Sequence, residues 1–257
     1  MRRIADFGKG RSHLVDPAHP VRIPAMKIAL IGYGAMGRLI GALAEAKGHE
    51  VVAKIDDGDA RLSAVQLAEK LKGADAAIDF TTADAVPRNV EACMIAGVPI
   101  VVGTTGWNDQ RREIEKLVRD ADGAIVFGAN FSIGMNLFYR IADHAAELFA
   151  KFAEYETFIE EQHHSRKKDS PSGTSLKIKE IVAKHIDKEF TVASTRAGNI
   201  PGTHRVGFDG PADQILLEHT ARSREGFALG AITAAEWIVG KKGFYDFTDV
   251  MAQIIDK

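Results

Sequence analysis

The chain of 257 residues is long enough for one large domain or two smaller ones, and its hydrophobic fraction of 46% is ordinary for a globular protein. A formal net charge of -2 gives no basic field that would attract nucleic acid, and the single cysteine excludes intramolecular disulfides and cysteine-based zinc sites. No apolar stretch has the length of a membrane span. We therefore expect a cytoplasmic protein that binds neither nucleic acid nor membrane.

Residues 1–25 differ in composition from the rest of the chain, because basic residues alternate with glycine and proline and no hydrophobic signal-peptide core is present. We interpret them as a flexible N-terminal extension or as the product of an early start codon, with Met26 the functional beginning. Asp6 and Asp16 dilute the positive charge that a targeting peptide needs. We expect no catalytic role for this segment.

From Lys27 onward, short apolar segments alternate with helix-like segments. Buried-strand patterns occupy residues 27–31, 50–55, 76–80, 98–102 and 124–127. Helical composition occupies residues 38–47, 61–72, 84–96 and 108–120. Strands that alternate with helices of this size predict an α/β fold, with a Rossmann-type parallel sheet covered by helices on both faces.

A glycine-rich turn joins the first strand to the first helix. Gly32 permits a tight turn, Gly34 lets backbone approach a pyrophosphate, and Gly37 lets the helix pack close to the strand. The helix N-terminus then presents free N–H groups to the phosphates. The alternative is a strand–helix turn that binds no ligand. We predict dinucleotide contacts along the whole turn, at Gly32, Tyr33, Gly34, Ala35, Met36 and Gly37.

Asp56 ends the second strand and is placed to accept hydrogen bonds from the ribose hydroxyls of the adenosine. A carboxylate at this position repels a 2′-phosphate, so NADH is the first choice of coenzyme. Lys54 or Arg61 can offset the acid, and NADPH therefore stays open as the alternative.

Small and hydroxyl residues follow three later strands, at the edge of the sheet where open α/β folds bind ligands. They leave room for a flat ring and supply hydrogen bonds. Their alternative role is to cap the helices that follow, through Thr82, Asn108 and Ser132. We predict further cofactor contacts at Phe80, Thr81, Gly103, Thr104, Thr105, Gly128, Ala129, Asn130 and Phe131.

The second half of the chain changes its pattern. Helical segments are expected at residues 132–151, from Pro171 to about Lys188, and at 226–239 and 247–255; strands are expected at 155–164, 189–195, 204–210 and 213–220. The mixed alternation suits an antiparallel sheet with one covered face, which is also a natural oligomer surface. We place a hinge near Ala129–Asn130 and expect the last two helices to return to the nucleotide domain.

Residues 162–174 concentrate imidazole, positive charge and a helix start, the parts that acid–base chemistry on an anion needs. His163 and His164 end a strand and should point to opposite sides of it. Three cationic side chains follow, and a Pro-Ser-Gly-Thr turn opens a helix. The alternatives are a metal site at the histidine pair, a solvated basic run, or a turn that only caps the helix. We expect no metal, since no second histidine or thiolate cluster accompanies the pair.

Several segments together resemble the dihydrodipicolinate reductase family, over Met26 to the C-terminus. Residues 31–38, 79–81, 103–106 and 129–132 carry part of the likeness, as does the arginine-to-histidine segment 196–204. The most specific motif is His163-His164-x-x-Lys167-x-Asp169-x-Pro171-Ser-Gly-Thr174. The glycine turn is one residue shorter than in many members, and Thr82 stands where some carry arginine.

The resemblance implies a nucleotide domain, residues 26–129 and 227–257, and a mixed α/β domain, residues 130–226, that binds substrate and forms a homotetramer. It implies hydride transfer from NADH or NADPH to a small cyclic dicarboxylate in lysine and diaminopimelate biosynthesis. His163 is then the proton donor and Lys167 its cationic partner in catalysis, while substrate is bound by His164, Ser172, Gly173 and Thr174.

Residue chemistry agrees with these roles. Histidine ionises near neutrality and suits protonation of a ring made electron-rich by hydride addition. The ammonium of Lys167 stabilises negative charge, and N–H groups of Gly173 and Thr174 at a helix start bind a carboxylate. Two further hypotheses stay open: another two-domain amino-acid or hydroxyacid dehydrogenase, and a non-catalytic NAD(H)-binding homologue.

Overall fold

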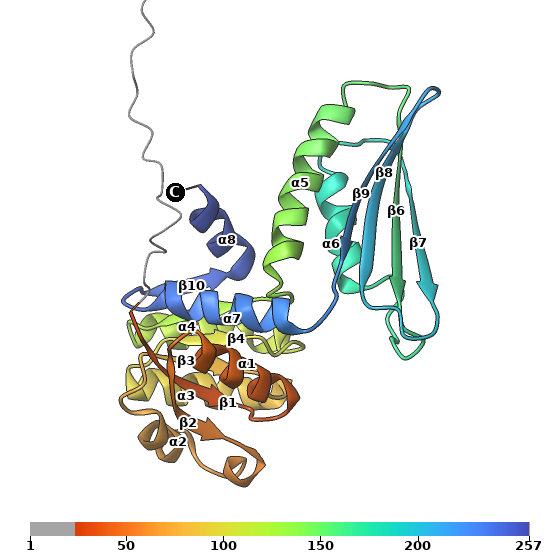
Figure 1. The fold of residues 1–257 in the computed structure, drawn as a ribbon. Helices are drawn as coiled ribbons and strands as arrows, with labels where there is room; N and C mark the ends of the chain where they lie inside the picture. The colour runs from red at the N-terminus through yellow and green to blue at the C-terminus, as the bar shows by residue number, and fades with distance from the viewer. Residues whose placement is uncertain (1–23, 257) are drawn as a thin grey trace, which may run out of the picture.

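The computed structural model describes residues 24–256, and the predicted extension therefore lies outside the described residues except for its last two positions. The described chain forms two sheets with helices packed on each (Figure 1). None of the helices in this part of the chain is long and apolar enough to cross a membrane.

The first sheet is six-stranded, and every neighbouring pair in it is parallel. Its spatial order is β10-β5-β4-β3-β1-β2, which confirms the predicted Rossmann-type arrangement. The strands are β1 (Lys27–Ile31), β2 (Glu50–Ile55), β3 (Ala76–Asp79), β4 (Ile100–Val102), β5 (Ala124–Phe127) and β10 (Gly243–Asp246). The carboxyl ends of the central strands meet at one edge, where the predicted cofactor residues follow.

Both faces of this sheet are covered, because side chains of successive strand residues point to opposite sides. Ile28 and Leu30 of β1 pack on one face, against α1 (Ala35–Ala46), α7 (Glu225–Ile238) and α8 (Phe247–Ile255). Ala29 and Ile31 pack on the other, against α2 (Ala64–Leu71), α3 (Val86–Ala96) and α4 (Arg111–Asp120). The last two helices thus pack on the parallel sheet, as expected.

Strand β10 was not predicted. Gly243-Phe-Tyr-Asp246 is short, half-buried and begins with a glycine, so no alternating or continuous apolar pattern marks it. It forms because β5 offers a free edge, to which it pairs in parallel from Gly243 to Asp246. The pairing closes the sheet beside α4 and α8, which both contact β10.

The second sheet has four strands in the order β7-β6-β8-β9. Its strands are β6 (Glu156–His163), β7 (Thr191–Arg196), β8 (Thr203–Asp209) and β9 (Gln214–Thr220). The β6–β7 pair is parallel, whereas β8 runs antiparallel to both of its neighbours, β6 and β9. The carboxyl end of β7 and the loop from β6 to α6 lie at the end of this sheet nearer to the parallel sheet (Figure 1).

Helices α5 (Ile133–Phe149) and α6 (Gly173–Val182) cover one face of the second sheet, as Figure 1 shows. Ile159, Val206 and Phe208 from the sheet and Phe138 and Ile178 from the helices form this third core. The opposite face carries no helix among the described elements, so the expectation of one covered face is confirmed. The expectation of an antiparallel sheet is wrong for one pair, because β7 returns through α6 and pairs in parallel with β6.

Helix α6 ends earlier than predicted, at Val182 rather than near Lys188. The N–H groups of Lys184 and His185 bond three residues back, to the carbonyls of Ile181 and Val182, and this tighter turn stops the helix. The predicted helix over residues 61–72 also begins late. Ser63 caps α2 through a capping box with Gln66, a start signal that outweighs the helical composition before it.

Candidate active site

The turn after β1 has the shape that the glycine spacing predicts. Gly32 has φ +88°, and a Cβ there would stand 2.3 Å from the carbonyl oxygen of Phe80. A Cβ on Gly37 would stand 2.1 Å from the carbonyl oxygen of Gly32. Gly34 is the N-cap of α1, and a Cβ on it would meet nothing within 4 Å. The space before this helix is therefore open, and the cradle fits the pyrophosphate of a dinucleotide.

Charges of both signs surround the predicted ribose position. Asp56 is exposed at the end of β2 and accepts a 2.9 Å hydrogen bond from the N–H of Asp57, which orients its carboxylate. The ammonium of Lys54 lies 4.9 Å from the centroid of the Tyr33 ring, and the guanidinium of Arg38 lies 6.0 Å from it. A carboxylate and two cations thus stand close to the same turn.

Asp79, which the sequence did not single out as a site residue, holds together the loops at the carboxyl edge of the parallel sheet, where the predicted cofactor residues lie. Its carboxylate is fully buried and accepts hydrogen bonds from the N–H and hydroxyl of Thr81, the hydroxyl of Thr104 and the amide of Asn89. Burial raises the pKa of Asp79, and these donors oppose the rise. The loops after β3 and β4 are held to one buried acid.

The other predicted cofactor residues lie at the same edge but differ in how their side chains are used. The Phe80 ring covers Gly103, where a Cβ would stand 2.1 Å from a ring atom. The hydroxyl of Thr104 is committed to Asp79, and Thr105 is exposed. Phe131 is buried against Phe247, so its side chain belongs to the core. The side chains of Thr104 and Phe131 are therefore not free to meet a ligand.

The capping roles considered for this edge are only partly correct. Ser132 caps α5 by accepting a hydrogen bond from the N–H of Met135, as expected. Thr82 makes no side-chain capping bond, and Trp107 rather than Asn108 occupies the N-cap of the turn that precedes α4. Capping therefore does not account for Thr82 or Asn108.

His163 is the last residue of β6, and its side chain is buried on the covered face of the second sheet. Strand alternation puts Glu161 on the same face, and the Nδ1 atom of His163 lies 2.8 Å from Oε2 of Glu161. This is a close charge contact without the alignment of a full hydrogen bond. His164 is half-buried, just past the end of the strand.

Glu161 is almost fully buried, and donors from β7 and from the start of α6 converge on it. Its Oε1 atom accepts from the N–H of Ser172, the hydroxyl of Ser194 and the guanidinium of Arg196, at 3.0, 2.8 and 2.6 Å. Burial raises the pKa of Glu161, but the hydrogen bonds from Ser172, Arg196 and Ser194 outweigh it and lower the pKa to about 2. A stable negative charge thus lies next to His163.

His204 lies opposite Glu161 on β8 and was missed as a member of this cluster. Its ring centroid is 5.1 Å from that of His163, and its Nε2 atom is 3.3 Å from the hydroxyl of Ser172. Burial lowers the pKa of His204 to about 4, so this ring is neutral at neutral pH. Burial also lowers the pKa of His163, while the charge of Glu161 opposes that change.

Lys167 stands apart from its basic neighbours, since it is half-buried while Arg166 and Lys168 are exposed. Its ammonium lies 2.8 Å from Oδ1 of Asp169. The other oxygen of Asp169 accepts a long, 3.4 Å hydrogen bond from the N–H of Gly173, at the first position of α6. A carboxylate of the chain therefore bridges the lysine and the helix start, where a substrate carboxylate was expected.

The predicted substrate and cofactor residues meet at one contact. The amide of Asn130, at the end of the β5 loop, donates a 3.4 Å hydrogen bond to the hydroxyl of Thr174. Ser172 is buried, caps α6 by accepting from the N–H of Ser175, and so faces inward rather than into the site. The start of α6 and the residues after β5 are neighbours, and the expected hinge segment joins the two predicted sites.

Three possible metal ligands also come together here, since Glu161, His163 and His204 place ligand atoms within 4.8 Å of one another. The carboxylate already neutralises the guanidinium of Arg196 at 2.6 Å. A cation placed between the three would stand beside that fixed positive charge and would displace an existing ion pair. The donor set therefore fits an acid–base cluster better than a metal centre.

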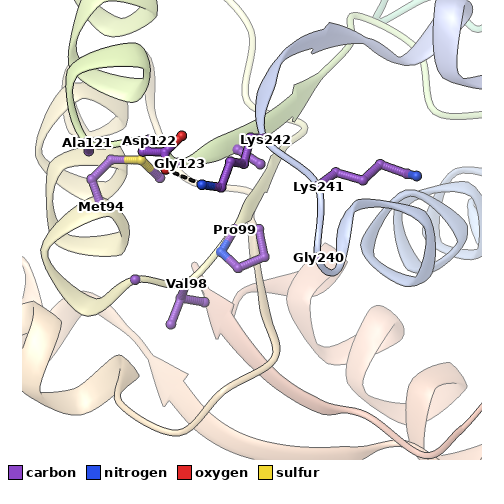
Figure 2. Close-up of a pocket in the computed structure, with 11 residues that line it drawn as sticks. Met94, Val98, Pro99, Ala121, Asp122, Gly123, Gly240, Lys241 and Lys242 are labelled. Atoms are coloured by element: carbon purple, nitrogen blue, oxygen red, sulfur yellow. Dashed lines mark hydrogen bonds and ion pairs between the residues drawn. The ribbon is translucent and has the colours of Figure 1, made fainter.

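Two neighbouring hollows, of about 230 and 350 Å³, lie away from these residues. Figure 2 shows the first, between the start of β4 and the loops before β5 and β10. Both are bordered by Asp122, Gly123 and Lys242, at the amino-terminal edge of the parallel sheet. The side chain of Lys242 is paired with Asp122, so its charge is already neutralised and is not available to a ligand in either hollow.

Comparison with known proteins gives consistent matches over both halves of the chain. Residues 26–131 match the family model described as dihydrodipicolinate reductase, N-terminus, and residues 134–251 match the model of its C-terminus. Curated proteins named 4-hydroxy-tetrahydrodipicolinate reductase are similar to this chain. The one from Christiangramia forsetii is 34% identical, covering 89% of this chain and 99% of that protein; the one from Archaeoglobus fulgidus is 36% identical, covering 88% and 100%.

Solved structures agree on the fold. The dipicolinate-bound dihydrodipicolinate reductase from Paenisporosarcina sp. TG-14 superimposes with a TM-score of 0.70 at 21% identity, covering 88% of this chain and 99% of that one. An amine dehydrogenase from Mycobacterium smegmatis gives a TM-score of 0.57 at 11% identity, covering 87% and 95%. At such identities the likeness shows a shared two-domain architecture.

Proposed function

The chain belongs to the dihydrodipicolinate reductase family and reduces 4-hydroxy-tetrahydrodipicolinate with a pyridine nucleotide. From this premise we propose which of its residues bind the coenzyme, which bind the substrate and which catalyse the reduction. The product is tetrahydrodipicolinate, an intermediate of lysine and diaminopimelate biosynthesis. The observation that supports our assignment most strongly is the contact of Asn130 with Thr174, which joins the proposed coenzyme edge to the start of α6, where the N–H of Ser172 contacts Glu161.

The glycine turn and the loops after β3, β4 and β5 form the coenzyme site in this proposal. The open space before α1 receives the pyrophosphate, and Asp56 accepts hydrogen bonds from the ribose. We propose NADH as the preferred coenzyme, although Lys54 and Arg38 give the site enough positive charge to use NADPH as well. When bound, the reduced nicotinamide supplies the hydride.

His163 donates the proton that completes the reduction. Addition of hydride to a C=C–C=N system leaves negative charge on the ring, and a nearby imidazolium neutralises it. Burial lowers the pKa of His163 in the substrate-free protein. A dicarboxylate bound beside the ring raises that pKa again, because it brings negative charge to the site. The acid is thus charged most fully when substrate is present.

Lys167 and the start of α6 hold the substrate carboxylates. The Paenisporosarcina relative has dipicolinate bound, a cyclic dicarboxylate, which supports the same class of ligand for this chain. Lys167 and the N–H of Gly173 now contact Asp169. A substrate carboxylate takes the place of Asp169 on these donors, and His164 and Thr174 complete the binding site. Ser172, whose side chain faces inward, contributes by capping α6.

We further propose that residues 26–129 and 227–257 act as the coenzyme domain and residues 130–226 as the substrate and assembly domain. The open face of the second sheet is the assembly surface. Leu216 is 46% exposed there, beside the paired charges of Arg205, Glu160 and Glu218. Packing of this face against other copies of the chain produces the homotetramer.

A coupled assay tests the proposed function. Condensation of aspartate semialdehyde with pyruvate supplies the substrate, and oxidation of NADH or NADPH is followed by the loss of its absorbance. We expect coenzyme oxidation only when the condensation product is present. No oxidation with either coenzyme, or equal oxidation with simple hydroxyacids or keto acids, would contradict the assignment.

A further inference from the structure

Glu161 is a buried acid that the proposed mechanism does not use. It has a relative exposure of 1%, and it lies two residues before His163 on the covered face of β6. Its Oε2 atom is 2.8 Å from Nδ1 of His163 and 3.9 Å from Nε2 of His204. The carboxylate therefore contacts Nδ1, the buried ring nitrogen of His163.

The other ring nitrogen of His163 has a different environment. A Cβ built on Gly202 would stand 3.1 Å from Nε2 of His163 and 3.4 Å from its Cδ2. Since glycine has no side chain, the space beside Nε2 is kept clear. Nδ1 of the ring thus faces a fixed charge, and Gly202 leaves beside Nε2 the room that a side chain would fill.

We propose that Glu161 is a positioning residue for the proton donor: its negative charge, 2.8 Å from Nδ1 of His163, keeps that side of the ring turned inward so that Nε2–H faces the substrate. This inference rests on the proposed role of His163. In the protonation step the Nε2–H bond of His163 breaks, and an electron pair of the reduced substrate ring forms a C–H bond with that proton. The Nδ1–H bond of His163 stays intact beside Glu161, and the neutral imidazole later takes a proton from water.

The charges that face His163 explain why this carboxylate matters. Lys167, from the loop after β6, and Arg196, from the end of β7, both disfavour a positive imidazole. Asp169 and Glu161 favour it, and His204 from β8 lies beside the ring. His219 on β9 faces His204 rather than His163. Glu161 is the negative group in direct contact with the ring.

The surroundings of Glu161 keep it negative and fixed. The backbone N–H of Ser172, the Ser194 hydroxyl and the Arg196 guanidinium all donate to Oε1, which leaves Oε2 for the histidine. Strand β7 and the start of α6 therefore position the carboxylate before substrate arrives. A group that only filled space would not need an ion pair on each of its two oxygens.

Glu161→Gln is the decisive variant, with Glu160→Gln as the matched control. Glu160 is the neighbouring residue on the opposite face of β6 and pairs with Arg205. Nuclear magnetic resonance titration of the His163 ring in the substrate-free protein should show a pKa lower by about 1 unit or more in Glu161→Gln than in wild type. Glu160→Gln should leave the titration unchanged.

The pH dependence of kcat supplies the second readout. Protonated His163 is the active form, so kcat falls as the pH rises through its pKa, and Glu161→Gln should move that fall to lower pH. We expect kcat at neutral pH to decrease about 10-fold or more, with the KM for NADH unchanged. Glu161→Asp, which keeps the charge, should recover the wild-type pH profile even if its kcat is lower.

A reduced kcat with an unshifted His163 titration and an unshifted pH profile would overturn the proposal and leave Glu161 a structural residue. If Glu161→Gln does not fold, the Glu161→Asp profile decides: a displaced profile despite the retained charge also contradicts the proposal. The titration needs no substrate. It therefore separates failure of this inference from failure of the proposed reaction, which the wild-type coupled assay reports.

Discussion

At the residue scale, the mechanism that we propose depends mainly on one carboxylate and one histidine. Burial and two cations lower the pKa of His163, and Glu161 opposes this change, which favours the proposed role of His163 as an acid. Asp169 has a comparable role at Lys167, whose hydrogen bond holds the pKa of Asp169 below its ordinary value. Each cationic or proton-donating group of the site is thus matched to an acid of the chain in the substrate-free state.

Asp56→Ala tests whether Asp56 contacts the adenosine ribose of the coenzyme and so discriminates between NADH and NADPH. Removal of the carboxylate abolishes its repulsion of a 2′-phosphate and leaves Lys54 and Arg38 nearby. We expect the ratio of kcat/KM for NADPH over NADH to rise about 10-fold or more, roughly 1.4 kcal/mol. The comparison variant is Asp57→Ala, whose exposed side chain lies one residue further along the turn. An unchanged ratio in Asp56→Ala would remove this residue from the ribose site.

At the scale of elements, Asp79 fixes the positions of the loops at the carboxyl edge of the parallel sheet. Four donors from the loop after β3, the loop after β4 and helix α3 meet its carboxylate. The residue lies at the carboxyl end of β3, so its loss affects the loops that we assign to the coenzyme and spares the opposite edge.

Asp79→Ala should lower the free energy of unfolding by about 3 kcal/mol, because it leaves buried donors unsatisfied. It should also raise the KM for NADH several-fold, since the loops after β3 and β4 lose their common anchor. Asp75→Ala is the control: Asp75 is exposed at the other end of β3 and accepts one hydrogen bond, from the N–H of Lys27. Chemical denaturation and steady-state kinetics measure both quantities. Equal effects of the two substitutions would contradict the anchoring role.

Local patterns account for most of the elements but not for the His163 cluster. Alternation along β6 places Glu161 and His163 on one face, so their proximity could be predicted from the sequence. Arg196, Ser194 and His204 join them only through strand register, and no local pattern specifies which residues of β7 and β8 stand opposite. Strand β10 could not be predicted for a related reason: its pairing with β5, rather than its composition, makes it a strand.

At the scale of the whole molecule, the second sheet presents an uncovered face while the first sheet is covered on both sides. We expect the wild-type protein to have about four times the chain mass of 27.9 kDa in light scattering. Leu216→Arg should produce smaller species, because a long charged side chain would lose its hydration and disturb the packing of this sheet face. Val65→Arg, at a 61% exposed position of α2, should keep the wild-type mass. A monomeric wild type would refute the proposed assembly.

In the proposed mechanism the proton and the hydride must both reach one substrate ring, although His163 and the proposed coenzyme residues follow strands of different sheets. The amide of Asn130, after β5, donates a hydrogen bond to the hydroxyl of Thr174 on α6 and so joins the two regions. We therefore expect His163 and the coenzyme to act on the same bound substrate.

The kcat of His163→Gln in the coupled assay tests this arrangement most directly. We predict a decrease of roughly 10²-fold or more at neutral pH, with the affinity for NADH unchanged, because the variant lacks the acid but keeps the coenzyme edge intact. His144→Gln, at an exposed position of α5, serves as the control and should retain wild-type activity. A wild-type kcat in His163→Gln would contradict the role of this histidine as the proton donor.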